Sequence, residues 1–245
     1  MIQFIVLLIA ILSGFIYYVL DQPYVTFAGL FLVMLCLRFN SRTLHLGKFV
    51  EILFIFFLIS YIIEGFRISY PGSLIIVLTF LVILIFLEGP EWSKLYFSTR
   101  NTKAYLRLSL FVSALFLLLF GLSVYFSIDE IENPVQLPID IVIMLGIGVA
   151  FYLPIMEEII FRSFIFERAK SAAAVSITAV FAQGALYGFM LYQNGVPSGV
   201  LGSIVGGFFG VSLGYLVHKS GSIYPSMFAH FIVTLGIFIE LAILG

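Results

Sequence analysis

The chain has 245 residues, of which 62% are hydrophobic and 10% are charged, and its mean hydropathy is +1.18. A soluble domain carries roughly 25% charged residues, so this composition excludes an ordinary soluble domain and predicts a polytopic all-α membrane bundle. The net charge of −1 argues against a nucleic-acid partner. The partners we expect are the lipid bilayer and a membrane protein or peptide.

Nine apolar runs are long enough to cross a bilayer, so we expect about 8–9 membrane-spanning helices. The first run has no basic segment before it and no small-residue cleavage site, which indicates a retained helix. The longest polar stretch, 88–107, separates N-terminal transmembrane helices with a cytoplasmic loop, 1–104, from a C-terminal transmembrane domain, 105–245. The runs lie at 2–20, 24–38, 49–66, 72–88, 105–127, 137–165, 172–192, 197–217 and 223–244.

Basic residues occur in every second linker, a pattern that the positive-inside rule assigns to the cytoplasmic side. They lie around 38–48, 94–107, 168–170 and 219, whereas the acidic linker 129–132 has no Lys or Arg. We therefore expect a cytoplasmic N-terminus, a cytoplasmic 168–170 linker and an external 129–132 linker. If the first two runs formed one helix, only the N-terminus would change sides.

Glycines recur at helical spacing in the last third of the chain. Gly184 and Gly188 are four residues apart in the seventh run, and the eighth run has a glycine at every fourth position. Such spacing lets neighbouring helix backbones approach closely in a membrane. It predicts close helix packing in a compact bundle and argues against a wide aqueous pore. The glycines of the eighth run are Gly202, Gly206, Gly210 and Gly214.

Two adjacent carboxylates, Glu157 and Glu158, interrupt an apolar run that contains Pro154. A charge inside a membrane costs about 2.5–3.5 kcal/mol on insertion scales, so such residues are functional candidates. Arg162 follows Glu158 by four residues, which is the favourable order for an ion pair on one helix face. Glu157 lies about 100° around the helix from Glu158 and has no partner in this segment. We therefore expect a neutralised Glu158 and a Glu157 that is free for chemistry.

His230 lies at a depth similar to that of the carboxylates. It is about 12 Å past Ser222 along one helix, and Glu158 is about 15 Å before Arg168 along another. We expect Glu157, Glu158 and His230 to line one cavity that opens toward the cytoplasmic side. A carboxylate and an imidazole in a low-dielectric pocket can activate a water molecule for attack on a carbonyl group. The alternative is a structural network in which these groups only satisfy one another.

Other polar residues suggest weaker alternatives. A zinc site would need a further ligand besides Glu157, Glu158 and His230, and the chain has no H-E-x-x-H motif, so we expect no metal and no cofactor. A Ser–His dyad would use Ser163 or Ser226, without the support of a G-x-S-x-G elbow. Four further ionisable residues are expected at interfaces or solvated helix ends: Asp140, Glu240, His45 and His218.

Two separated segments resemble the CPBP family, which contains the CAAX prenyl proteases and the bacteriocin-processing or immunity (Abi) proteins. The first is Glu157-Glu158-x-x-x-Arg162 after a proline and an apolar run. The second is 220–230, Ser-Gly-Ser-Ile-Tyr-Pro-Ser-Met-Phe-Ala-His. The resemblance covers residues 137–245. It implies a multi-pass protein of a prokaryotic cell membrane that hydrolyses a peptide bond near the cytoplasmic membrane face.

The resemblance also implies a role for each matching residue. Glu157 is similar to the glutamate that activates the hydrolytic water, and Glu158 with Arg162 is similar to its supporting pair. His230 is similar to the later histidine that helps to stabilise the oxyanion. The family has Asn or Asp four residues after that histidine, and Thr234 occupies this position here.

A further family motif, F-x-x-x-H, is similar to Tyr187-Gly-Phe-Met-Leu191, so a leucine replaces its histidine. Leucine cannot accept a proton, whereas the threonine at 234 can still donate one hydrogen bond. Two functions therefore stay open at this point. One is an intramembrane endopeptidase of the glutamate type. The other is a catalytically impaired, protease-like scaffold that binds and regulates a membrane protein partner.

Overall fold

The computed structural model describes residues 2–38, 43–66, 96–99, 101–126, 139–173, 175–195 and 198–244, together with five single residues between 76 and 86. All regular secondary structure in these ranges is helical, which confirms the predicted all-α class.

The helices follow the predicted apolar runs. Eight of the nine runs coincide with a helix or a continuous helical segment, and the run at 72–88 falls largely outside the described residues. Two α-helices continue directly into π-helical segments. In chain order the elements are α1 (Ile2–Gly14), η1 (Phe15–Val19), α2 (Pro23–Arg38), α3 (Leu44–Gly65), α5 (Thr102–Phe126), α6 (Ile139–Glu158), η5 (Ile159–Ile165), α7 (Phe166–Ala172), α8 (Ser176–Asn194), α9 (Gly199–Ser220) and α10 (Tyr224–Leu244).

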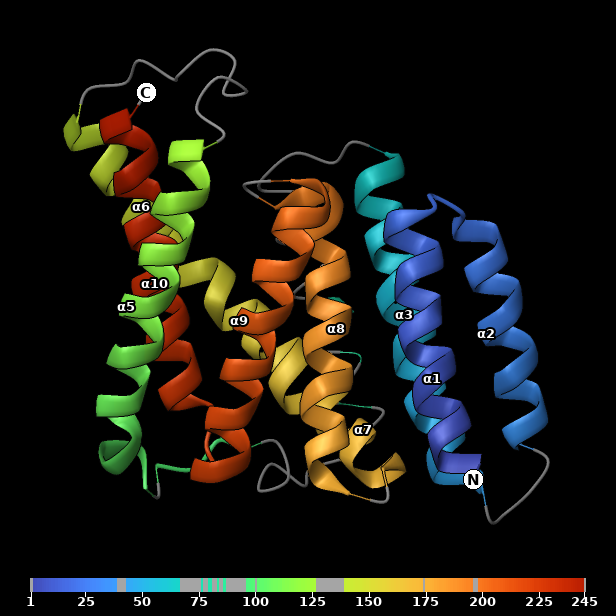
Figure 1. The fold of residues 1–245 in the computed structure, drawn as a ribbon. Coiled ribbons are helices and arrows are strands. Elements are labelled where there is room, and N and C mark those ends of the chain that lie inside the picture. Colours follow the sequence, from blue (N-terminus) through green and yellow to red (C-terminus); the bar gives the residue numbers. More distant parts are fainter. Residues whose placement is uncertain are drawn as a thin grey trace.

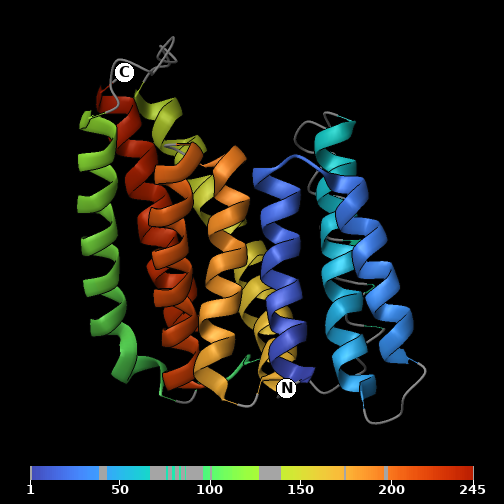
Figure 2. The same cartoon turned by 45° about the vertical axis from the view of Figure 1, so that its right-hand side comes forward.

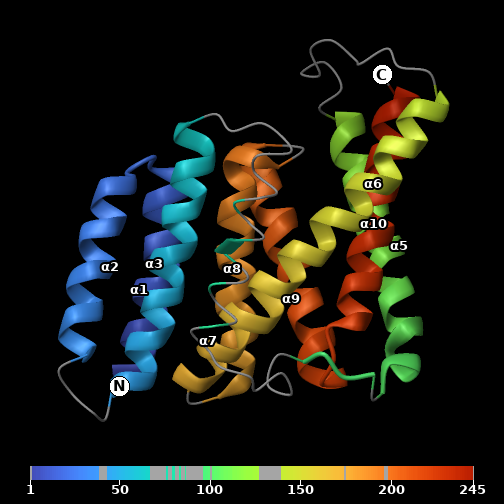
Figure 3. The ribbon, with the colours of Figure 1, turned by 180° about the vertical axis from the view of Figure 1, so that it is seen from behind.

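The helices run between two ends of one bundle, and the N- and C-termini lie at opposite ends (Figure 1). α1, α2 and α3 form one side, α8 and α9 the middle, and α5 with α10 the other side (Figure 2). α6, η5 and α7 cross behind α8 and α9 as one inclined segment (Figure 3). This segment carries the two adjacent glutamates into the middle of the bundle.

The charged side chains are distributed unequally between the two ends of the bundle. Apart from Arg162, the described Lys and Arg residues lie at or near the end that holds the N-terminus and α7 (Figure 1). This arrangement fits the predicted alternation of basic linkers. We call it the basic end, and its residues are Arg38, Lys48, Lys103, Arg107, Arg168, Lys170 and Lys219.

Five helical segments among the described residues are long and apolar enough to span a membrane, and two further apolar helices, Pro23–Arg38 and Tyr224–Glu240, are shorter. α8 belongs to neither group, because Gln183 and Gln193 lower its hydropathy. Together these helices form an integral membrane protein. The five long segments are Ile2–Val19, Leu46–Gly65, Thr102–Leu122, Asp140–Ser171 and Gly199–Ser220.

α8 and α9 pack backbone against backbone, as their glycine spacing predicts. A Cβ atom on Gly188 would lie 2.5 Å from the carbonyl oxygen of Ser203 and 2.8 Å from Cα of Gly207. A Cβ atom on Gly184 would lie 2.7 Å from the backbone nitrogen of Val211. These distances are shorter than any van der Waals contact, so the interface requires glycine at both positions.

The orientation of the bundle can be tested by cysteine labelling after the native Cys36, which is exposed, has been replaced by serine. The Gln193→Cys variant, near the far end of α8, should react with a membrane-impermeant maleimide in intact cells. The Ser171→Cys variant, at the end of α7, should react only after permeabilisation, because basic linkers are retained inside. Labelling of position 171 alone in intact cells would mean that the orientation is reversed.

The tight α8–α9 interface predicts an effect of one added methyl group. Gly188→Ala should lower the free energy of unfolding by about 1–3 kcal/mol, because overpacking forces the two backbones apart. Gly148→Ala on α6 is the matched control, since nothing lies within 4 Å of its Cβ position. Unfolding midpoints in detergent micelles compare the two variants. Equal midpoints would show that the α8–α9 interface accommodates the added methyl group without loss of stability.

Candidate functional site

The inclined α6–η5–α7 segment contains an irregular helix at the level of the two glutamates. Pro154 lies inside α6 and cannot donate the backbone hydrogen bond of a regular turn. Beyond Glu158 the helix continues as η5, with the wider π-helical turn, and η5 contains Arg162. π-helical turns inside α-helices occur frequently at functional sites.

The turn between α9 and α10 fixes the start of the helix that bears His230. Gly221 ends α9 in the left-handed backbone region, with φ of 67°, which favours glycine. The hydroxyl oxygen of Ser222 accepts a hydrogen bond of 3.2 Å from the backbone N–H of Tyr224 and so caps α10. The backbone N–H of Ser222 donates in turn to the Ser220 hydroxyl at 3.1 Å. The Ser-Gly-Ser sequence therefore defines where α10 begins.

Two serines of α5 hold the first half of α10 in place. Ser109 donates a hydrogen bond of 2.8 Å to the carbonyl oxygen of Pro225, and Ser113 lies 3.2 Å from that of Ala229. Such interhelical hydrogen bonds contribute to helix association inside a membrane. Because Ala229 directly precedes His230, they fix the position of the imidazole.

Glu158, Arg162 and His230 form one group, which we call the buried charge set. Oε1 of Glu158 lies 2.9 Å from Nδ1 of His230 and 3.4 Å from Nη1 of Arg162. Glu158 and Arg162 have no exposed surface, and His230 is 4% exposed. The predicted ion pair is therefore present, and His230 reaches the same carboxylate. An ionised carboxylate only accepts hydrogen bonds, so Nδ1 of His230 carries the proton in this contact.

The guanidinium group of Arg162 is also covered by aromatic rings. Its central carbon lies 4.7 Å from the ring centre of Tyr187 and 5.6 Å from that of Phe161. Within the described part of the chain, its three nitrogen atoms have no hydrogen-bond partner. The ion pair with Glu158 and the cation–π contacts therefore compensate this buried charge.

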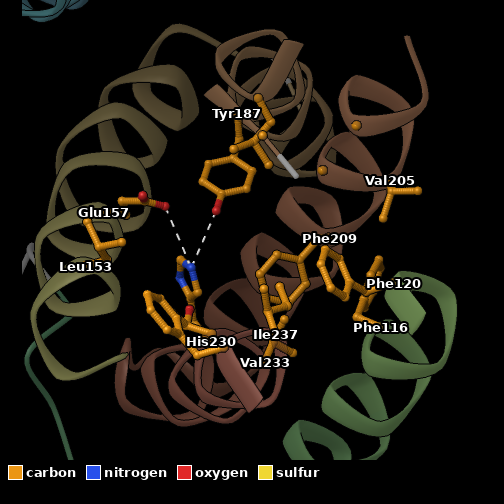
Figure 4. A pocket seen from close by; sticks show the side chains of 16 residues that line it. Phe116, Phe120, Leu153, Glu157, Tyr187, Val205, Phe209, His230, Val233 and Ile237 are labelled. Atoms are coloured by element: carbon orange, nitrogen blue, oxygen red, sulfur yellow. Dashed lines mark hydrogen bonds and ion pairs between the residues drawn. The ribbon is translucent and has the colours of Figure 1, made fainter. Parts of the chain in front are cut away.

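Glu157 and Tyr187 converge on the second ring nitrogen of His230 (Figure 4). Oε2 of Glu157 lies 3.7 Å from Nε2 of His230, and the Tyr187 hydroxyl lies 3.4 Å from the same nitrogen. Oε2 of Glu157 is buried and has no hydrogen-bond partner among the described residues. The imidazole thus faces Glu158 with its Nδ1 and the Glu157 carboxylate and Tyr187 hydroxyl with its Nε2.

These three groups lie at one end of a cavity of about 240 Å³ between α5, α6, α8, α9 and α10 (Figure 4). Thr234 adds one more hydroxyl to the lining, which otherwise consists of apolar residues and glycines. Glu157 and His230 therefore share a cavity as predicted. Glu158 does not line it, because its carboxylate points to Arg162 and to Nδ1 of His230.

The cavity extends away from the basic end, so the predicted opening toward that end is wrong. Beyond the polar groups, its lining residues include Leu191, Gly202 and Ile237, from the parts of α8, α9 and α10 that lie far from α7. Toward α7 the space is filled by buried side chains of η5, among them Arg162 and Phe164. Counting residues along a helix gives the depth of a group but not the side on which space remains.

The serine and metal alternatives gain no geometric support. The Ser226 hydroxyl donates a hydrogen bond of 2.8 Å to the carbonyl oxygen of Ile223, one turn back in the same segment, and Ser163 is fully buried in η5. Among the described residues, no group of three or more His, Cys, Asp and Glu side chains is placed to hold a metal ion. That the protein uses no cofactor stays a prediction.

The remaining ionisable candidates lie outside the cavity lining. Asp140 is exposed in the first turn of α6, and His218 lies in the last turn of α9. Glu240 sits near the end of α10, beside Gly121 of α5. The side chain of His45 falls outside the described residues.

The sequence prediction missed Tyr187 as a site residue and did not single out Ser109 and Ser113. The sequence does contain a pattern that points to these residues: polar side chains four residues apart, which lie on one face of a helix. Ser109 and Ser113 form such a pair inside an apolar run, as do Gln183 and Tyr187 in α8. Gln183 donates a hydrogen bond of 2.7 Å to the backbone carbonyl of Gly210, so this face of α8 is turned toward α9.

The buried charge set makes a prediction about stability. Glu158→Gln leaves Arg162 buried without a counter-charge, so it should lower the free energy of unfolding by about 3–5 kcal/mol. Glu167→Gln is a suitable control, because Glu167 pairs with Lys170 at 3.9 Å in a partly exposed position. That change should cost about 1 kcal/mol or less. The amount of protein in the membrane and the unfolding midpoint are measured, and a Glu158→Gln variant as stable as the control would contradict the pairing.

Residues 138–236 match the family of type II CAAX prenyl endopeptidases described as Rce1-like. The match begins one residue before α6 and ends within α10, so it contains the buried charge set and both Glu157 and Thr234. It leaves out α1 to α3 and α5, and the boundary expected between 104 and 105 stays a prediction. No curated protein and no solved structure matches the chain. The Rce1-like match over this segment, within an all-helical bundle, supports the resemblance of residues 137–245 to the CPBP family.

Proposed function

We propose that this protein is an intramembrane endopeptidase of the glutamate type, in which Glu157 activates a water molecule. The observation that carries the proposal is the position of Oε2 of Glu157. This atom is buried, lies 3.7 Å from Nε2 of His230, and has no hydrogen-bond partner among the described residues. A carboxylate at the polar end of a cavity is a proton acceptor that faces the space available to a substrate. The family description, which names an endopeptidase, supports the same reaction class.

In the proposed reaction, the oxygen of water forms a bond to the carbonyl carbon of the peptide while Glu157 takes one proton from that water. The π electrons of the carbonyl group move to its oxygen, and the Nε2–H group of a doubly protonated His230 stabilises the resulting negative charge. The C–N bond then breaks, and Glu157 returns its proton to the leaving nitrogen. Glu158 acts on His230, because its Oε1 accepts the hydrogen bond from Nδ1–H, and Arg162 acts only through its ion pair with Glu158.

We place the cleaved bond in the half of the bundle nearer the basic end, which we infer to be the cytoplasmic half. Glu158 precedes Arg168 by ten residues, a rise of about 15 Å along a helix. The cavity extends from the site toward the opposite end and is lined mainly by apolar side chains. Apolar parts of the substrate would therefore lie in the cavity, and the scissile bond would lie at its polar end.

Glu157→Gln tests the proposal, because glutamine keeps the size of the side chain but cannot take a proton from water. Cleavage should fall by about 10²–10⁴-fold. The family description suggests the first probe, a peptide that ends in a prenylated cysteine, two aliphatic residues and one terminal residue. A mixture of unmodified apolar peptides is tested beside it. Products are measured by mass spectrometry with purified protein in liposomes.

Glu240→Gln is the matched control, since it makes the same chemical change in an α10 carboxylate that does not line the cavity. This variant should cleave at the wild-type rate. If Glu157→Gln cleaved as fast as Glu240→Gln at equal protein amounts, Glu157 would not be the proton acceptor.

Leu191 favours a second function, in which the protein binds a membrane protein partner without hydrolysing it. This leucine lines the same cavity as Glu157 and His230, at the position where the family motif has a histidine. The two functions differ in their response to Glu157→Gln. A scaffold would release no product even as the wild type, and both proteins would bind the prenylated peptide equally well in a fluorescence anisotropy titration.

A further inference from the structure

α8 presents two side chains to the cavity, Tyr187 and Leu191, and they are one helical turn apart. Residues four apart lie on the same helix face, so the two occupy successive levels of one wall. Leu191 is at the level farther from the buried charge set, where it packs against Gly206 of α9. Compared with the F-x-x-x-H pattern, the polar group of α8 has moved one turn toward His230.

The ring of Tyr187 is held on several sides. Tyr187 is 3% exposed, and its ring lies 4.7 Å from the guanidinium carbon of Arg162. The ring of Phe161 approaches it edge-on, with centres 5.2 Å apart and planes at 90°. The ring faces are therefore occupied by packing, while the hydroxyl points toward Nε2 of His230 at 3.4 Å (Figure 4). The only polar atom of this side chain is thus fixed at the polar end of the cavity.

We propose that Tyr187 is a second oxyanion donor, a catalytic residue whose hydroxyl replaces the polar group that Leu191 cannot provide. This inference rests on the function proposed above. Two donors 3.4 Å apart can both bond one oxygen atom that lies between them, which is the geometry of an oxyanion hole. Glu157, at 3.7 Å from Nε2, is too far for a direct hydrogen bond to the imidazole and faces the same space. The hydroxyl keeps its proton throughout, and no bond to Tyr187 is made or broken.

The test begins with Tyr187→Phe, which keeps the ring on Arg162 and removes only the hydroxyl. With the prenylated peptide as the probe, kcat should fall by about 10²–10³-fold, the usual effect of losing one oxyanion donor. KM should change little, because the hydrogen bond forms in the transition state. Tyr18→Phe is the matched control, since Tyr18 is 1% exposed and bonds to Ser60 at 3.0 Å outside the cavity. It should keep the wild-type kcat.

A second variant separates a polar role from a packing role. The double variant Tyr187→Phe/Leu191→His returns a polar group to the α8 wall, one turn farther along. It should raise kcat at least about 10-fold above that of Tyr187→Phe, which is part of the about 10²–10³-fold that one oxyanion donor contributes. A tyrosine that served only to pack against Arg162 would show no such recovery, because the phenylalanine ring already fills that space.

A third measurement does not depend on turnover. The chain has three histidines, so the Nε2 signal of His230 can be assigned in ¹⁵N-histidine-labelled protein by comparison with His230→Gln. Tyr187→Phe should shift this signal, and Tyr18→Phe should not. An unshifted signal overturns the inference, because the hydroxyl would then not reach the imidazole.

A Tyr187→Phe variant with the wild-type kcat also overturns the inference, and in that case the hydrolysis by Glu157 stands. If the wild type releases no product, the proposed function fails and the catalytic role of Tyr187 fails with it. The two failures can be told apart, because a failure of the proposed function already appears in the wild type, whereas a failure of the Tyr187 role appears only in the Tyr187→Phe variant.

Discussion

The rest of this structure depends on the pairing of ionisable groups that are buried away from water. Glu158 and Arg162 have no exposed surface, and a buried ion without a partner costs several kcal/mol. The contacts of 3.4 Å with each other and 2.9 Å with His230 offset that cost, as does the Tyr187 ring over the guanidinium group. These groups come from the α6–η5 segment, α8 and α10. The Glu158–Arg162 pair forms within one segment, but its contacts with His230 and Tyr187 require α10 and α8 to be packed against that segment.

The helices around the ion pair pack closely against one another. The glycines of α8 and α9 bring two backbones together at the level of Tyr187, so that ring cannot withdraw from Arg162. On the other side, Phe56 of α3 packs edge-on against Phe161 with ring centres 5.3 Å apart. The N-terminal helices, which lie outside the Rce1-like match, thus support the site from behind. They help to bury Arg162 and Glu158, and burial strengthens the electrostatic contact between these two side chains.

The elements that could be predicted were those with a strong local signal. Apolar runs gave the helices, spacing of four gave the Glu158–Arg162 pair and the glycine interface, and residue counting gave the common depth of His230. Tyr187 was missed because a tyrosine in an apolar run has the same local pattern whether it faces lipid or an imidazole. The direction of the cavity was wrong for a related reason. It depends on which side chains fill the space around η5, and this filling is decided by helices that are distant in sequence.

The reaction proposed above needs one imidazole and no second histidine. In the proposed reaction His230 carries a proton on each ring nitrogen, so the formal charges of Glu157, Glu158, Arg162 and His230 sum to zero. Nδ1–H then faces Glu158, and Nε2–H faces the cavity, where the oxyanion of a bound substrate would form. Under the proposed reaction His230 keeps both of its ring protons. The proton that moves passes from water to Glu157 and then to the leaving nitrogen. A leucine at 191 is compatible with this division, since the position would no longer need to accept a proton. The hydroxyl of Tyr187 supplies a neutral donor beside Nε2 of His230.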